Sequence, residues 1–209
     1  MPAPTDSSYD SYWAHRGSSG NRYRYGVFLG WIPNGSTVLD AGCGDGFLGS
    51  RLLHEKQCIV TGMDVAQVAL DKAQERGLTV VQGSLDQALP FADNSFDYVI
   101  ASESIEHIVQ SEAALKELYR VARRAVLISV PNTGFWRYRW QLLRGTFPKQ
   151  WLMHPWEHIR FWTIRDFQMM TRGLGFQIRH ICAGSGRRWL RDWWPSLFAE
   201  QVCYYIPKS

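Results

Sequence analysis

The sequence lacks a long hydrophobic run and has few cysteines. No apolar stretch approaches the ~18–20 residues that a transmembrane helix needs, which excludes a spanning segment of that kind. The four cysteines are scattered and form no C-x-x-C pair, so they indicate reduced thiols rather than a disulfide framework. Because the start is also not signal-like, we expect a cytoplasmic protein. A chain of 209 residues can form one domain, 1–209, with a core that needs no disulfide or metal.

A strong charge of one sign is also missing. The net charge is only +4, which does not by itself predict a nucleic-acid partner, and we expect none. The distribution of residues along the chain is more informative than the net charge, because arginine and tryptophan concentrate after residue 130. No internal repeat or low-complexity segment is present.

The most informative stretch runs from Thr37 to Phe47 and reads TVLDAGCGDGF. It predicts a short buried strand, a tight turn at three glycines and the start of a helix. Glycines at such a turn allow a ligand to lie against the main chain, whose free N–H groups at the helix start point outward. The turn could equally do no more than close a strand-helix unit.

Asp64 favours the ligand-binding interpretation. It follows a second apolar run and lies 20 residues after Gly44, about the spacing at which a carboxylate accepts both ribose hydroxyls. A dinucleotide-binding turn would more often have its third glycine one position later and no acid before it. Here the third glycine is Gly46, and Asp40 precedes the turn.

Residues 38–46 therefore resemble the first motif of the class I S-adenosylmethionine-dependent methyltransferases. The resemblance continues through residues 83–85, 89–91, 95–99 and 106–108. It implies that S-adenosyl-L-methionine is the cofactor. One departure is Ser84, which stands where many of these enzymes have an acid for the adenine amino group; Asp86 could substitute. The implied cofactor-binding residues are Asp40, Gly42, Cys43, Gly44, Gly46, Met63, Asp64, Val65, Gly83, Ser84, Leu85 and Ser102.

Apolar runs and helical patterns alternate along the chain. This alternation predicts an α/β fold of the Rossmann-like methyltransferase type: a seven-stranded, mostly parallel sheet with an antiparallel edge strand and helices on both faces. Ligands should bind at the carboxyl ends of the strands. The expected strands are 37–40, 59–63, 79–82, 98–101, 126–129, 176–182 and 201–206, and the expected helices are 46–54, 66–76, 112–122 and one that Thr163 caps.

Glu106 and His107 follow the fourth strand. Carboxylate and imidazole groups at the mouth of the cofactor cleft could remove a proton from the methyl acceptor, and histidine is suited to this near neutral pH. His107 is the best candidate base, with Glu106 and the more distant His158 as further catalytic candidates. Alternatively the pair only packs a helix start, since transfer to an ionised acceptor needs no base.

Two other segments are rich in aromatic and basic residues. Residues 1–26 form a tail and cap, in which we expect Tyr12, Trp13 and Arg16 to cover the cofactor and bind substrate; packing on the sheet edge is an equal alternative. Residues 131–162 form an insertion after the fifth strand, with Trp136, Arg137 and Arg139 as candidate acceptor ligands. This insertion could instead rest on a membrane surface or form a small satellite core.

The insertion also contains His154-Pro155-Trp156-Glu157-His158, which fits a bare H-x-x-E-H metal pattern. Because Pro155 interrupts the helix that would aim both imidazoles at one ion, and no third ligand is evident, we expect no metal site.

The second half of the chain narrows the resemblance. Residues 130–137, 141–145, 162–167 and 195–201 are similar to methionine biosynthesis protein W, the MetW type. That family has a methyltransferase fold but is associated with a homoserine acyltransferase partner in methionine synthesis. Two functions follow: methyl transfer to a small-molecule acceptor or to a lipid- or glycan-linked one, or a non-catalytic role as partner of a homoserine acyltransferase. The Glu106-His107 pair, usual in methyltransferases but not in the MetW type, favours the enzyme.

Overall fold

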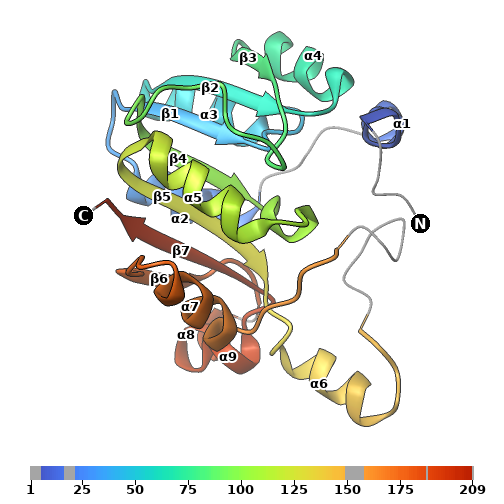
Figure 1. The fold of residues 1–209 in the computed structure, drawn as a ribbon. Coiled ribbons are helices and arrows are strands. Elements are labelled where there is room, and N and C mark those ends of the chain that lie inside the picture. Colours follow the sequence, from blue (N-terminus) through green and yellow to red (C-terminus); the bar gives the residue numbers. More distant parts are fainter. Residues whose placement is uncertain (1–5, 17–21, 149–157, 187, 209) are drawn as a thin grey trace.

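The computed structural model describes residues 6–16, 22–148, 158–186 and 188–208. Seven strands form one sheet in the order β3-β2-β1-β4-β5-β7-β6 (Figure 1). Strand β7 is antiparallel to both of its neighbours, β5 and β6, and the remaining pairs are parallel. This arrangement confirms the predicted fold class. The strands are β1 Thr37–Ala41, β2 Ile59–Asp64, β3 Thr79–Gln82, β4 Phe96–Ser102, β5 Ala122–Pro131, β6 His180–Ala183 and β7 Gln201–Pro207.

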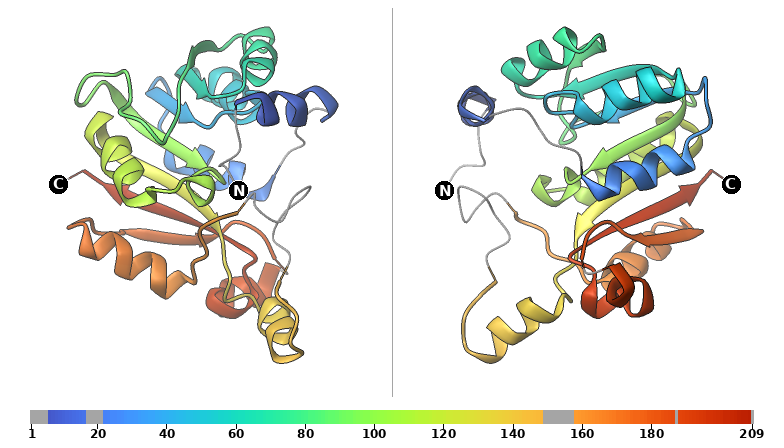
Figure 2. Two further views of the ribbon diagram at one scale, coloured as in Figure 1. Left: turned by 45° about the vertical axis from the view of Figure 1, so that its right-hand side comes forward. Right: turned by 180° about the vertical axis from the view of Figure 1, so that it is seen from behind.

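Helices cover both faces of the sheet (Figures 1 and 2). One face packs against α2, α3 and α4, the other against α5 and α7. The α-helices are α1 Asp6–His15, α2 Tyr23–Trp31, α3 Phe47–Lys56, α4 Gln67–Glu75, α5 Ser111–Val121, α6 Trp136–Leu143, α7 Ile164–Gly173, α8 Arg188–Trp193 and α9 Pro195–Phe198, with a short 3₁₀ helix η1 at Ile105–His107. Within the described ranges, no helix has the length and apolar character that crossing a membrane requires.

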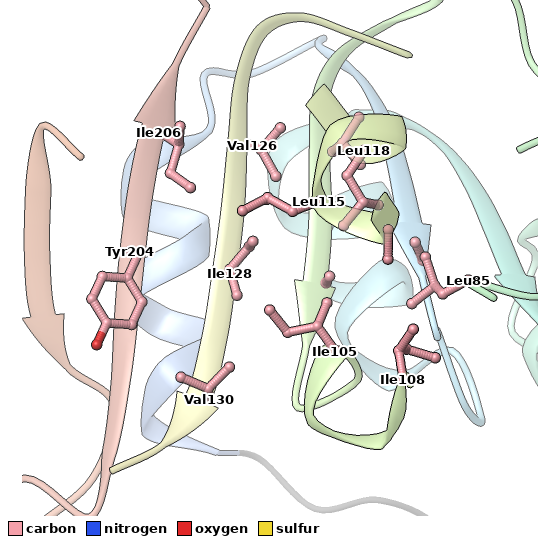
Figure 3. Packing of buried hydrophobic residues seen from close by; sticks show 14 of the residues in the cluster. Leu85, Ile105, Ile108, Leu115, Leu118, Val126, Ile128, Val130, Tyr204 and Ile206 are labelled. Carbon is pink, nitrogen blue, oxygen red and sulfur yellow. The ribbon is translucent and has the colours of Figure 1, made fainter. Parts of the chain in front are cut away.

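Alternating residues of the central strands fill the two core layers. Figure 3 shows Leu115 and Leu118 of α5 beside Val126 and Ile128 of β5, with Tyr204 and Ile206 of β7 continuing the same layer. All these side chains are at most 1% exposed. Each Å² of apolar surface that is buried stabilises the fold by roughly 25 cal/mol. This core therefore holds the strands in register and fixes where their carboxyl ends lie.

Several parts of the chain differ from the sequence prediction, and strand β5 begins at Ala122, four residues before its predicted start. Helix α2 begins inside the segment 1–26 that we treated as a cap and continues past its end. It buries Phe28 and Leu29 on the sheet rather than over a ligand. The penultimate strand begins at His180 and not at Phe176, so its predicted start was wrong. Helices α8 and α9 were not predicted, because a six-residue and a four-residue helix show no sustained periodicity.

Candidate functional site

The glycine turn lies at the carboxyl end of β1 and leads into α3. Gly44 and Gly46 have positive φ angles of +53° and +71°, which side-chain-bearing residues rarely adopt. A Cβ on Gly44 would lie 2.5 Å from the indole of Trp13, and one on Gly46 would lie 2.7 Å from Cβ of Ala73. Glycine is therefore required here both by the backbone conformation and by close approach of neighbouring groups.

Asp64 ends β2 beside this turn, as predicted. One carboxylate oxygen accepts a hydrogen bond from Gly44 N–H at 2.9 Å, and the other accepts one from Ala66 N–H at 3.0 Å. Burial raises the pKa of Asp64 even though these backbone donors favour the charged form. Each oxygen keeps a further lone pair, so the carboxylate can still accept two hydroxyl groups.

Asp40 lies beneath the turn, with only 1% of its surface exposed. Burial, the charge of Asp64 and that of Asp45 raise its pKa to about 7, opposed by a hydrogen bond from the Gly49 backbone. Its neighbour along the turn, Asp45, is held by Arg76, which donates to the Asp45 backbone oxygen at 2.7 Å and to its carboxylate at 3.1 Å. Sequence reasoning missed Arg76, because nothing in its local sequence links it to the turn.

The other predicted cofactor residues surround the same edge of the sheet. Met63 accepts backbone hydrogen bonds from Gly42 and Cys43 through its carbonyl oxygen, which joins the first two loops. In the third loop, Ser84 Oγ accepts a hydrogen bond from Asp86 N–H at 3.1 Å, so both candidate adenine ligands belong to one small turn. Of the remaining members, Val65 and Gly83 are half-buried, whereas Leu85 is 7% exposed and belongs to the core.

Helix α1 lies against α4 and the glycine turn (Figure 1). Asp10 accepts a hydrogen bond from Val68 N–H at 3.0 Å, and Lys72 donates to the backbone oxygen of Trp13. The guanidinium of Arg16 lies 4.9 Å from the ring centroid of Tyr12 and 5.4 Å from that of Trp13. The structure therefore brings all three predicted residues of this segment together, with the indole of Trp13 against Gly44.

The loop after β4 adjoins the same turn, because a Cβ on Gly42 would lie 2.4 Å from Ser104 Oγ. In this loop Glu106 is fully buried, and burial together with the charge of Glu103 raises its pKa well above the usual range. The rings of His107 and His158 meet edge to face, with centroids 4.8 Å apart. All three predicted catalytic candidates are thus gathered in one place.

A buried polar network joins this loop to both ends of the chain. Arg24 donates to Ser102 Oγ and to Gln201 Oε1, each at 3.0 Å. Gln201 in turn donates to Glu103 at 2.7 Å, and the hydroxyls of Ser102 and Ser129 lie 3.2 Å apart. Ser102, predicted as a cofactor ligand, is therefore engaged with Arg24. Neither Arg24 nor Gln201 was predicted, since their partners lie 78 or more residues away.

Helix α6 projects away from the sheet and from the glycine turn (Figures 1 and 2). Trp136 is 47% exposed, and Arg137 and Arg139 are also exposed. Arg139 turns back to donate to Gly134 O at 2.6 Å. The structure does not bring these three residues together with His107 and His158. His154 of the metal-like pattern, like the rest of 149–157, lies outside the described part.

Comparison with known proteins places this geometry in a family. A family model described as methionine biosynthesis protein MetW matches residues 22–206. The bifunctional methionine biosynthesis protein MetXA/MetW of Rhodopirellula baltica is 35% identical over 117 residues, which are 52% of this chain and 19% of that protein. Malonyl-[acyl-carrier protein] O-methyltransferase of Serratia marcescens is 35% identical over 118 residues, 56% of this chain and 44% of that protein. The chain thus spans less than half the length of these curated relatives.

Solved structures share the fold. Magnesium protoporphyrin IX methyltransferase of Synechocystis PCC 6803, solved with bound S-adenosylhomocysteine, superposes with a TM-score of 0.69 at 18% identity, covering 97% of this chain and 95% of that one. A chain from the complex of the Haloferax volcanii Trm112 methyltransferase activator with a methyltransferase gives a TM-score of 0.72 at 15% identity, covering 96% and 97%. These similarities show a class I methyltransferase fold, and the match over residues 22–206 shows that the chain belongs to the methionine biosynthesis protein MetW family.

Proposed function

We propose that the protein binds S-adenosylmethionine and transfers its methyl group to a small-molecule or lipid-linked acceptor. The observation that carries the proposal is the joint geometry of the glycine turn and Asp64, which place backbone donors and a carboxylate at the carboxyl ends of β1 and β2. Asp64 would accept the ribose hydroxyls, and the Ser84 loop would lie along the adenine. Catalysis would then rest mainly on proximity and orientation of the sulfonium methyl group and the acceptor atom.

The test is calorimetric titration with S-adenosylhomocysteine. Replacing Asp64 by alanine removes charge-assisted hydrogen bonds, which typically costs ~1.5–3 kcal/mol, or about 10- to 150-fold in affinity. Asp64→Asn repeats the test with the side-chain size kept. Asp71→Ala, an exposed carboxylate on the neighbouring helix α4, is the matched control and should bind normally. Equal affinity of all four proteins, or a preference for NAD, would contradict the proposal.

A second function has support of its own. In the Rhodopirellula relative, one polypeptide carries both the MetXA and the MetW designation. A fused pair of this kind favours a protein partner for a MetW-type chain, and the MetW resemblance implies that this partner is a homoserine acyltransferase. The exposed surface of α6 offers a place for such a contact, with Trp136 and Trp140 47% and 55% exposed beside Arg137 and Arg139. Exposed aromatic and arginine side chains are typical of protein-binding surfaces.

The double variant Arg137→Ala/Arg139→Ala separates these functions. If α6 docks a partner or a membrane, this change weakens capture by a homoserine acyltransferase or by anionic liposomes, whereas S-adenosylhomocysteine binding and methyl transfer survive. If α6 instead completes an acceptor pocket, turnover is lost while cofactor affinity holds. Arg51→Ala, on the far helix α3, serves as the control for loss of an arginine.

A further inference from the structure

Glu106, His107 and His158 form a compact cluster of potential metal ligands. One ligand atom from each, a carboxylate oxygen and two imidazole nitrogens, lie within 4.8 Å of one another. The two rings stand nearly perpendicular, at 84°. Such an arrangement lets two imidazoles and a carboxylate approach one point from different directions, as ligands of a single ion must.

Backbone hydrogen bonds join the two chain segments that carry the cluster. The carbonyl oxygen of Glu106 accepts hydrogen bonds from Ile159 N–H at 3.0 Å and from Arg160 N–H at 3.1 Å. Arg160 also donates through its guanidinium to Val109 O. His158 is therefore fixed next to the β4 loop by main-chain contacts that do not depend on its own side chain. A ligand set assembled from two segments in this way is preorganised.

The two carboxylates of this loop, Glu103 and Glu106, have few compensating donors. Glu106 is fully buried, and neither of its side-chain oxygens has a hydrogen-bond partner among the described residues. Glu103 accepts from Gln201 through one oxygen, while its other oxygen has no such partner. Glu103 also adopts a φ of +56°, a strained conformation for glutamate. Arg24, the buried arginine of the neighbouring network, directs its hydrogen bonds to Ser102 and Gln201.

A buried carboxyl group without a hydrogen-bond partner destabilises the fold, so such groups are normally paired or bound to metal. A divalent cation between Glu106 and the two imidazoles would satisfy it. Among the described residues, no lysine or arginine donates a hydrogen bond to these two oxygens.

We propose that Glu106, His107 and His158 bind a divalent cation, with Glu103 as a nearby second carboxylate. Two nitrogen donors and one oxygen donor suit borderline ions such as Zn²⁺ or Co²⁺ better than Mg²⁺, which prefers oxygen. Three protein ligands leave coordination positions open, as in catalytic rather than structural sites. The expectation of no metal, drawn from His154 and His158 as a helical pair, did not consider His158 together with Glu106 and His107.

The cation site adjoins the glycine turn through the contact between Ser104 and Gly42. If the methyl donor binds at that turn as proposed, the open positions would suit an acceptor with oxygen donors. Only this last step rests on the proposed function; the cation site itself does not.

The experiment is titration of the untagged, metal-free 209-residue chain with Co²⁺, followed by visible absorption and by calorimetry. The wild type should bind one ion, and Glu106→Gln and His158→Gln should each weaken binding at least tenfold. Mg²⁺ should bind more weakly than Co²⁺. His54→Gln, an exposed histidine on α3, is the matched control and should bind as the wild type does.

Thermal unfolding without metal establishes that each variant folds, and calorimetry with S-adenosylhomocysteine without metal reports the donor site separately. No Co²⁺ binding by the folded wild type would overturn the proposal. So would binding that survives both ligand substitutions, or that His54→Gln weakens equally. Loss of cofactor binding with intact Co²⁺ binding would instead count against the proposed function alone.

Discussion

The carboxylates at the two ends of the sheet have pKa values that are shifted in opposite directions. At the amino ends of β1 and β4, Asp97 accepts hydrogen bonds from the backbone N–H and the hydroxyl of Thr37, at 3.0 and 2.9 Å, and pairs with Arg123 and Arg124 at 2.8 and 3.0 Å. Burial alone would raise its pKa, but the Thr37 and Arg123 hydrogen bonds lower it to about 2. At the carboxyl ends, burial raises the pKa of Asp40, Asp64 and Glu106.

The difference separates a structural edge from a binding edge. A carboxylate with a full set of donors stabilises the fold, whereas carboxylates buried with few donors oppose folding and are retained where ligands can satisfy them. The carboxyl edge is also the place where ligands bind in open α/β sheets. A substitution at one edge should therefore change the property of that edge, stability or binding, without changing that of the other.

The largest effect is expected at Asp40. Its pKa of about 7 exceeds the unfolded value, so the folded state binds the extra proton and Asp40 reduces stability as the pH rises between about 4 and about 7. Asp40→Asn should remove this loss, making the variant more stable than the wild type at about pH 8 by up to about 4 kcal/mol, with little difference near pH 4. Urea unfolding at several pH values measures the gap; a gap independent of pH would contradict the assignment.

A smaller effect of the opposite sign is expected at Asp97. Asp97→Ala should lower the free energy of unfolding by about 2–3 kcal/mol at neutral pH, because it strands the donors of Thr37 and Arg123. Since the folded pKa is depressed, the ionised form's contribution is complete above ~4 and is lost as the pH falls toward 2. Asp93→Ala, which removes an exposed ion pair to Arg120, should cost only about 0–1 kcal/mol. Equal losses for the two variants would mean that Asp97 has no special role.

The smallest effect concerns the helix over the carboxyl edge. Trp13→Ala should weaken S-adenosylhomocysteine binding by about 1–2 kcal/mol, or roughly 5- to 30-fold, because the indole lies against Gly44 and would cover the bound ligand. Trp140→Ala on α6, where the side chain is 55% exposed, should leave affinity unchanged. Tighter binding by Trp13→Ala would show that the indole competes with the ligand instead of covering it.

Much of the fold could be predicted from sequence, because strands buried on both faces and helices with one apolar face leave clear local patterns. The strands at 37–40, 59–63 and 79–82 fall within one residue of β1, β2 and β3 at each end. The capping box at Thr163 and Asp166 shows why the start of α7 could be placed. The glycine turn and Asp64 were recognisable for the same reason, since their roles depend on short spacings.

What could not be predicted depends on contacts between distant residues. Arg24 joins Ser102 and Gln201 across 78 and 177 positions, so no window of sequence contains the network. The gathering of His158 with Glu106 and His107 likewise depends on how residues 158–160 return to the β4 loop. Two aromatic and basic segments looked alike in composition, yet Trp13 lies on the turn while Trp136 faces outward on α6.

The most direct test of the contrast between the two edges is backbone amide NMR during titration with S-adenosylhomocysteine. The account predicts that the amide signals of Gly44, Val65 and Ser84, at the carboxyl ends of the first three strands, shift strongly and saturate together. The amides of Thr37 and Asp97, at the opposite edge, should stay in place. Shifts concentrated at Thr37 and Asp97, or no saturable shift at Gly44, would contradict the assignment of the carboxyl edge as the binding site.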